Sequence, residues 1–179
     1  MSTVFTHSLV GASLALMAPK QVSRTAIVVV ATTLSILPDA DVLAFRLGIP
    51  YEHMYGHRGF THSLLFSCLV AFIASLVFFR SVGFANRNWF AVFIILFLAA
   101  CSHGIIDAFT DAGLGIGFFI PFSEQRYFFP WRPLETPPAG ISAFFNGDAL
   151  TIMLSEIKYV WAPLLLVVAV TRFFNRRTT

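Results

Sequence analysis

Long stretches without a charged residue constrain this chain more than any other feature. Residues 61–79 contain no Asp, Glu, Lys or Arg over 19 positions, and residues 88–106 form a second run of the same length. About 20 apolar residues in a helix are enough to cross the hydrocarbon core of a bilayer, which is roughly 30 Å thick. The chain is therefore predicted to be an integral membrane protein.

Composition supports this class. Of the 179 residues, 57% are hydrophobic and only 12% are charged, and the mean hydropathy is +0.77. In a soluble domain about a quarter of the residues are charged. Residues 1–179 are expected to form a single membrane domain, with Cys68 and Cys101 as buried free thiols inside apolar runs. The first nineteen residues lack Lys and Arg, so a cleaved signal peptide is not expected.

Three shorter apolar segments complete the predicted fold. Residues 4–18 and 25–37 are each short for a full span, and we expect a tight helical hairpin seated inside the bundle. Residues 159–171 reach spanning length when Lys158 and Arg172 extend toward the interfaces, and Pro163 is expected to kink this helix. The predicted fold class is an all-α, polytopic membrane bundle of about five transmembrane or half-spanning helices.

One long connection, residues 108–156, precedes the last helix. It is rich in Gly, Pro and aromatic residues, as in "GLGIGFFIPF" and "YFFPWRPLETPPAG". We expect loops and short interfacial helices here, on the extracytoplasmic side. Its aromatic residues would form either an interfacial lid or an aromatic belt.

Charge placement predicts the orientation. If all five segments cross, the connections around 19–24 and 80–88 and the tail after 171 share one face. That face contains basic residues and no acidic residue. By the positive-inside rule it is cytoplasmic, which places the amino terminus outside and the carboxyl terminus inside. The net charge of +3 then reflects anchoring, and no basic stripe suited to nucleic acid is present.

The remaining histidine and aspartate side chains are predicted to meet on the extracytoplasmic face. They come from four separate segments, and "FTHSLV" at 5–10 nearly repeats "FTHSLL" at 60–65. Such groups would repel one another or remain unpaired unless a cation held them together. The group comprises His7, Asp39, Asp41, His57, His62, His103 and Asp107.

Spacing supports a metal site. His103 and Asp107 are four residues apart, so both point from one helix face toward a shared ion. In "LPDAD" the two aspartates point in different directions, so one is expected to bind the ion and the other to bridge, act as a base or support a ligand. Imidazoles and carboxylates without thiolate suit zinc, manganese or iron, and clustered carboxylates suit two ions.

Each of these residues could also have a purely structural role. His7 near a helix end could be an interfacial or capping residue, and His103 and Asp107 could form a hydrogen bond with each other. Pro38 followed by Asp39 could serve only as a helix stop and turn. Arg58 could be a surface anchor, and His53 is expected to lie at the surface. Ionisable groups at membrane depth are costly, however, so the cluster as a whole favours a functional site.

The motifs "FTHSLVG", "LPDAD", "GHRGFTHSLL" and "SHGIIDAFTDAG" resemble, in order, those of the YdjM-like family of inner-membrane proteins. That family is described as LexA-regulated metal-dependent hydrolases and is distantly similar to zinc-dependent phospholipase C and S1/P1 nucleases. The resemblance implies a bacterial inner membrane location. It also implies one metal site of an Asp of "DAD", His62, His103 and Asp107, and a second with His7 and a bridging Asp107. The later HxxxE ligands of those relatives are missing, and His57 or Asp111 would complete a two-metal site.

A hydrolytic mechanism follows as an expectation. A bound metal lowers the pKa of its water toward about 7. Asp39 or Asp41 would accept the proton, and Arg58 is the candidate phosphate clamp because guanidinium binds phosphoryl oxygens bidentately. The predicted substrate is a phospholipid or a lipid-linked phosphate, with zinc as the first candidate metal and two ions expected.

Two other classes of function remain open from the sequence. Intramembrane His and Asp also occur in metal-ion and proton transporters, although no matching groups lie toward the predicted cytoplasmic side. A noncatalytic membrane protein stabilised by a metal is the third possibility. The sequence does not indicate an oligomeric state.

Overall fold

The computed structural model describes residues 1–137 and 149–177, and these residues form an all-α fold. No strands occur in these ranges, where only two isolated β-bridges are found. The all-α class predicted from the sequence is confirmed. The elements, in chain order, are α1 (Val4–Ala15), α2 (Arg24–Ile36), the 3-10 helix η1 (Leu37–Val42), α3 (Leu43–Arg46), the 3-10 helix η2 (Phe60–His62), α4 (Leu64–Phe78), the 3-10 helix η3 (Arg80–Val82), α5 (Arg87–Asp107), α7 (Ala149–Glu156), the π-helix η4 (Ile157–Trp161) and α8 (Ala162–Arg177).

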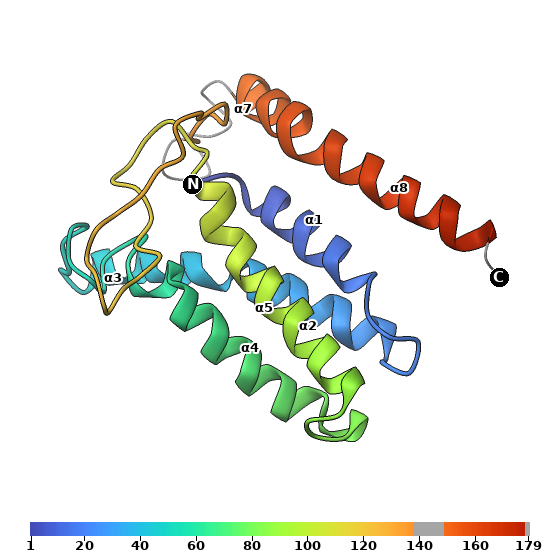
Figure 1. The fold of residues 1–179 in the computed structure, drawn as a ribbon. Helices are drawn as coiled ribbons and strands as arrows, with labels where there is room; N and C mark the ends of the chain where they lie inside the picture. Colours follow the sequence, from blue (N-terminus) through green and yellow to red (C-terminus); the bar gives the residue numbers. More distant parts are fainter. Residues whose placement is uncertain (138–148, 178–179) are drawn as a thin grey trace.

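Helices α1, α2, α4 and α5 pack side by side in a bundle, with α8 running along its outside (Figure 1). Their contacts are made by small buried residues such as Ala31, Ala71 and Ala99. Small residues let backbones approach closely, which is how helices associate where lipid is as apolar as the side chains. Gly11 of α1 illustrates this, because a Cβ there would lie 2.5 Å from Ser35 Oγ of α2.

Polar side chains mark where three of the bundle helices begin. Ser23 Oγ accepts from the backbone N–H of Ala26 at the start of α2. Ser63 Oγ accepts from Phe66 N (3.0 Å) at the start of α4. The Asn86 side chain does the same for α5. Each cap satisfies a backbone donor that a helix start leaves without an intrahelical partner.

The lengths of the helices differ from the sequence prediction. Residues 61–79 were predicted to form a 19-residue span, but α4 has 15 residues. Residues 60–62 instead form a 3-10 turn ahead of the Ser63 cap. Conversely, α2 continues through η1 and α3 into a helical stretch of 23 residues, Arg24–Arg46. The first helix has 12 residues, or about 18 Å at 1.5 Å per residue, and is short for a span as expected.

Among the described residues, three helical stretches are long and apolar enough to cross a membrane: Arg24–Arg46, Arg87–Asp107 and Ala149–Thr171. The last one includes α7, which is the end of the segment expected to be a connection. A π-helical turn, η4, lies directly before Pro163, which has no N–H to donate to the preceding turn. Residues 138–148 of the predicted connection lie outside the described residues.

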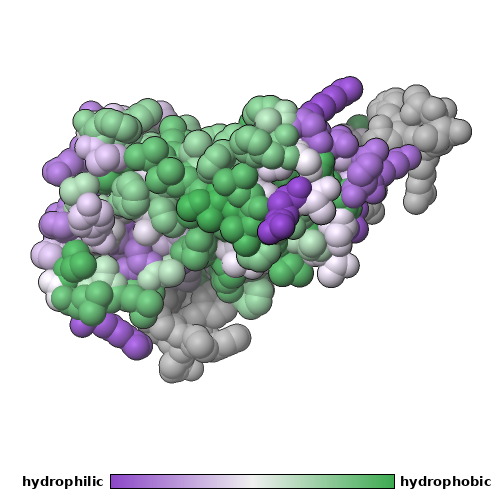
Figure 2. Space-filling view, turned by 90° about the horizontal axis from the view of Figure 1, so that it is seen from below, coloured by the Kyte–Doolittle hydropathy of each residue, from purple (hydrophilic) through white to green (hydrophobic). Residues whose placement is uncertain are grey.

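The surface is apolar around the middle of the molecule. Figure 2 shows hydrophobic residues across the centre and hydrophilic residues at both ends. Large apolar side chains are exposed on α4 and α8, among them Ile73, Val77, Leu166 and Val167. A water-soluble monomer rarely exposes so much continuous apolar surface, so these helices face lipid. Cys68 and Cys101 are free thiols, as predicted, but only Cys101 is buried; Cys68 is partly exposed because α4 packs with its small residues inward.

Residues 108–137 fold back over one end of the bundle, near the start of α1 and the end of α5. Gly117 N donates to Arg58 O (2.9 Å), and Arg126 donates to the backbone oxygens of His57 (3.0 Å) and Tyr51 (3.1 Å). This loop therefore holds the segment before α4 in place. The same end of the bundle contains the polar side chains identified in the sequence.

Candidate metal centre

Four elements bring histidine and aspartate side chains to this end of the bundle. His7 lies in α1, Asp39 in η1, His62 in η2, and His103 and Asp107 at the end of α5. All three of these histidines and Asp107 are buried, while the Asp39 side chain is 20% exposed. The predicted convergence of separate segments is therefore observed.

Four side-chain atoms from these residues face one another without hydrogen bonds. They are Asp39 Oδ1, His62 Nε2, His103 Nε2 and Asp107 Oδ2, which all lie within 4.8 Å of one another. His103 Nε2 is 3.2 Å from Asp39 Oδ1, and both histidine nitrogens are 3.9 Å from Asp107 Oδ2. Each of the four atoms is buried and unpartnered among the described residues. We call them the four-atom centre. Unpaired buried polar atoms are costly, and a divalent cation would satisfy all four.

The other nitrogen of each imidazole fixes the ring. His103 Nδ1 lies 2.8 Å from the backbone oxygen of Ser35, which can only accept, so Nδ1 carries a proton and Nε2 is the nitrogen that faces the centre. His62 Nδ1 faces Asp41 Oδ2 at 3.2 Å. Burial lowers the pKa of His62, which favours the neutral imidazole that binds metals. Histidine ligands oriented by a carbonyl or a carboxylate are typical of metal sites.

Asp41 has its two oxygens already engaged. Oδ1 accepts from His57 Nδ1 (2.6 Å), and Oδ2 accepts from Thr61 Oγ1 (2.6 Å) and Arg58 N (3.1 Å). Asp41, His57 and His62 also offer atoms close enough to hold an ion. A second ion there would have to displace these hydrogen bonds. The arrangement favours Asp41 and His57 as support for His62, and leaves Asp39 as the carboxylate of the pair that faces the centre.

His7 borders the four-atom centre. Its Nε2 lies 3.4 Å from Asp107 Oδ1 and 2.8 Å from Ser2 Oγ, and its ring stacks on His103 with centroids 3.7 Å apart. Ser2 N also donates to Asp107 Oδ1 (2.8 Å). His7 is thus placed against two members of the centre through stacking and a carboxylate contact, and the second metal site that the resemblance implied for it stays a prediction.

Arg58 was predicted to be either a phosphate clamp or a surface anchor. Its side chain is buried, so it is not a surface anchor. Its side chain is 1% exposed, with Nη1 donating to Ala112 O (2.7 Å) and Nη2 to Thr110 Oγ1 (3.0 Å). Nε lies 3.6 Å from Asp107 Oδ2. A Cβ on Gly113 would lie 2.4 Å from Nη1, so glycine makes room for the guanidinium. The positively charged guanidinium of Arg58 therefore lies next to the four-atom centre.

The structure does not bring Asp111 to this centre. Asp111 is exposed, and its Oδ1 accepts from both the N–H (2.9 Å) and the hydroxyl (2.8 Å) of Thr136. The carboxylate thus fastens the loop after residue 130 instead of completing a second metal site. His53 is exposed, as expected.

A cavity of about 540 Å³ lies beside the centre. His57 and Arg58 line it together with the apolar side chains of Val42, Phe45 and Tyr51. Val42 and Phe45 are 40% and 47% exposed, so one wall is continuous with the outer apolar surface. The cavity can receive a molecule that is part anionic and part apolar.

Two supporting residues were not identified from the sequence. Ser35 orients His103 through its backbone oxygen, a contact that leaves no signal in the sequence. Glu156 is fully buried in α7 and accepts from Thr3 N, Thr3 Oγ1 and Thr6 Oγ1, each at 2.5 Å. Its acidic side chain beside the last apolar run could have identified it, since buried carboxylates at membrane depth need partners.

The fold and centre define a helical membrane protein with a buried histidine–aspartate cluster at one end of its bundle. Comparison with known sequences identifies the family of this protein. The chain belongs to the YdjM inner membrane protein family, whose model matches residues 1–178. This confirms the family resemblance drawn from the motifs.

A curated relative supports the same assignment. The chain is 35% identical over 168 residues to "Inner membrane protein YbcI" of Escherichia coli (strain K12), covering 91% of this chain and 92% of the relative. No solved structure matches the chain. The family and the relative support the predicted location in a bacterial inner membrane.

Proposed function

We propose that this protein is a membrane-bound, metal-dependent hydrolase that cleaves a phosphoester of a phospholipid or a lipid-linked phosphate. The observation that carries the proposal is the four-atom centre, in which two imidazole nitrogens and two carboxylate oxygens are buried, face one another and make no hydrogen bond. This donor set, without thiolate, suits zinc, manganese or iron. A metal held there would supply activated water near neutral pH.

The proposed roles follow from burial and contacts. His62, His103 and Asp107 are buried ligands, and Asp39 is the one member of the centre that water reaches. Asp39 is therefore the proposed proton acceptor, a role that Asp41 cannot fill while both of its oxygens accept hydrogen bonds. One ion is enough for this scheme, and the second ion expected from the sequence would need Asp41 and His57 to exchange partners.

The substrate class is argued from the cavity beside the centre. Arg58 lines that cavity, and each of its Nη atoms has one N–H beyond those that donate to Ala112 O and Thr110 Oγ1, so the guanidinium can also donate to a phosphoryl oxygen there. Val42 and Phe45 give the same cavity an apolar wall. A phosphate attached to a hydrocarbon chain matches both parts.

The proposal is tested by metal-dependent release of phosphate or of a headgroup from phospholipid vesicles. Wild-type protein is compared with Asp39→Asn and with Asp111→Asn, a matched change at an exposed carboxylate outside the centre. We expect a loss of about 100-fold or more in Asp39→Asn, at the scale of general base catalysis, and near wild-type release in Asp111→Asn. No release by metal-loaded wild-type protein from any lipid, together with metal flux across liposomes, would instead establish the transport alternative.

A further inference from the structure

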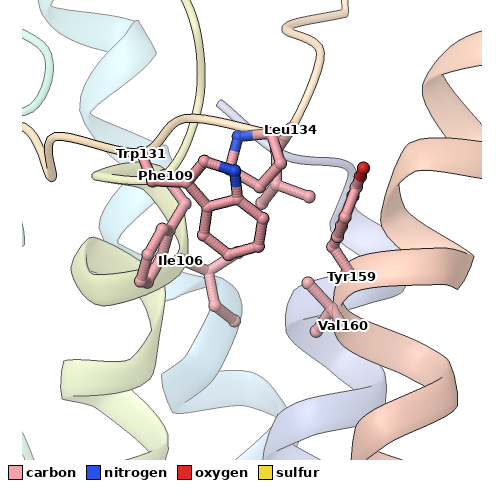
Figure 3. Close-up of a pocket in the computed structure, with 7 residues that line it drawn as sticks. Ile106, Phe109, Trp131, Leu134, Tyr159 and Val160 are labelled. Atoms are coloured by element: carbon pink, nitrogen blue, oxygen red, sulfur yellow. The ribbon is translucent and has the colours of Figure 1, made fainter.

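A second cavity shares no lining residue with the cavity that His57 and Arg58 line. It has a volume of about 230 Å³ and lies between the end of α5, the loop around residue 132 and the π-helix η4 (Figure 3). Its wall is made almost entirely of apolar and aromatic side chains. The labelled residues are Ile106, Phe109, Trp131, Leu134, Tyr159 and Val160.

Two helices that could cross a membrane both supply residues that line this cavity. Ile106 belongs to the stretch Arg87–Asp107, and Tyr159 and Val160 belong to Ala149–Thr171. The rings of Trp131 and Tyr159 meet edge to face across the cavity, with centroids 5.4 Å apart. Trp and Tyr side chains are typical of the level where lipid headgroups meet hydrocarbon. The cavity is therefore open to lipid chains at the depth of the interface.

Two cations are chain neighbours of residues that line the cavity. Arg132 follows Trp131 and Lys158 precedes Tyr159, and both cations are exposed. The Lys158 ammonium lies 4.9 Å from the centroid of the Tyr159 ring, and the Arg132 guanidinium lies 4.8 Å from that of Phe128. Within residues 1–137 and 149–177, neither cation forms an ion pair, even though Glu135 lies on the same loop as Arg132.

We propose that this cavity binds one acyl chain of an anionic membrane phospholipid, with the lipid phosphate held by Arg132 and Lys158. Charge complementarity selects the anionic lipid, because two exposed cations next in sequence to cavity-lining residues match a phosphate beside a hydrocarbon chain. Arg132 Nη1 also donates to Asp111 O (3.5 Å), a neutral acceptor that leaves its charge without an ion pair among the described residues. A zwitterionic lipid would add a third cation to the same place. This lipid is bound, not cleaved, and the proposal does not rest on the proposed hydrolysis.

Trp131 provides a direct reporter. The purified protein is reconstituted in phosphatidylcholine vesicles that contain increasing amounts of one lipid with brominated acyl chains. This lipid is brominated phosphatidylglycerol in one series and brominated phosphatidylcholine in the other. Bromine quenches nearby indole fluorescence, and the Trp131 signal is the difference between the wild-type protein and Trp131→Phe. We expect half-maximal quenching at a several-fold lower mole fraction of the brominated phosphatidylglycerol.

Three variants complete the test. Arg132→Gln with Lys158→Gln should abolish the preference for phosphatidylglycerol, whereas Lys20→Gln with Arg80→Gln, two exposed cations at the other end of the bundle, should retain it. Val160→Phe should reduce quenching by filling the cavity. Equal quenching by both lipids in the wild-type protein, or an unchanged preference in Arg132→Gln/Lys158→Gln, would overturn the proposal. Neither result depends on metal or catalysis.

Discussion

Asp41 and Asp39 show how two neighbouring carboxylates acquire different roles. Asp41 faces His57, Arg58 N and Thr61, whereas Asp39 Oδ1 faces the nitrogens of His62 and His103. The difference follows from their places in η1, where residues two apart point in different directions. One carboxylate orients a proposed metal ligand, and the other faces the four-atom centre.

Asp41→Asn tests the supporting role. The variant retains the shape of the side chain but loses the charge that holds His62 Nδ1–H, so metal affinity should fall by about 10- to 100-fold. Isothermal titration with zinc measures this loss. Asp111→Asn is the control and should retain wild-type affinity. Affinity equal to the wild type in Asp41→Asn would remove Asp41 from the support of the centre.

Much of the site could be predicted from the sequence at this scale. His7, His62, His103 and Asp107 were identified because ionisable side chains at the ends of apolar runs are costly to place and are rare there without a function. Asp111 was included wrongly with the centre, since a sequence does not show that Thr136 occupies its carboxylate. Glu156 was missed because its partners, Thr3 and Thr6, are 153 and 150 residues away along the chain.

At the scale of helices, the α1–α2 crossing couples packing to the centre. Gly11 lies against Ser35, whose hydroxyl donates to His7 O (2.8 Å) and whose backbone oxygen holds His103 Nδ1 (2.8 Å). Any displacement of α2 from α1 therefore moves a residue that orients a proposed ligand.

Gly11→Ala should lower both stability and metal affinity. The added Cβ would lie 2.8 Å from Ala31 O as well as 2.5 Å from Ser35 Oγ, so the two helices must separate. Overpacking of this kind costs about 1–3 kcal/mol. Thermal unfolding in detergent and zinc titration measure the two effects. Val29→Ile adds one carbon on the exposed face of α2 and should change neither stability nor metal affinity. Wild-type stability and affinity in Gly11→Ala would show that the crossing is loosely packed.

Helix boundaries were the least predictable part of the fold. An uncharged run shows where a helix can lie in a membrane. It does not show at which residue a capping hydrogen bond makes the helix begin. Ser63, the third residue of the run that starts at Thr61, caps α4, so that His62 can turn toward the centre. Conversely, the helical stretch that begins at Arg24 continues past Pro38. Pro38 lies in the first turn of η1, where a backbone N–H would have no partner within the helix, so its missing N–H does not interrupt the stretch.

At the scale of the whole molecule, the fold separates two ends with different charge. The connection between α1 and α2, the turn after α4 and the end of α8 lie at one end, and the polar centre lies at the other (Figure 1). Lys20, Arg24, Arg80 and Arg87 all belong to the first end. The positive-inside rule then predicts that this end is cytoplasmic and that the centre faces the extracytoplasmic side.

Cysteine labelling measures this orientation. In a background with Cys68 and Cys101 replaced by Ala, Gln125→Cys reports the end with the centre and Ser81→Cys reports the opposite end; both positions are exposed and uncharged. A membrane-impermeant thiol reagent added to intact spheroplasts should label position 125 and leave position 81 unlabelled until the membrane is permeabilised. The reverse pattern would invert the molecule in the membrane.

Metal content tests the central claim most directly. Tag-free wild-type protein, Asp107→Asn and Asp111→Asn are purified in detergent, loaded with zinc, manganese or iron, dialysed and measured by elemental analysis. The account predicts at least one equivalent of a divalent metal per chain in the wild type and in Asp111→Asn, and its loss in folded Asp107→Asn. Folded wild-type protein that retains none of the three metals would contradict it, because the four-atom centre would then hold no ion.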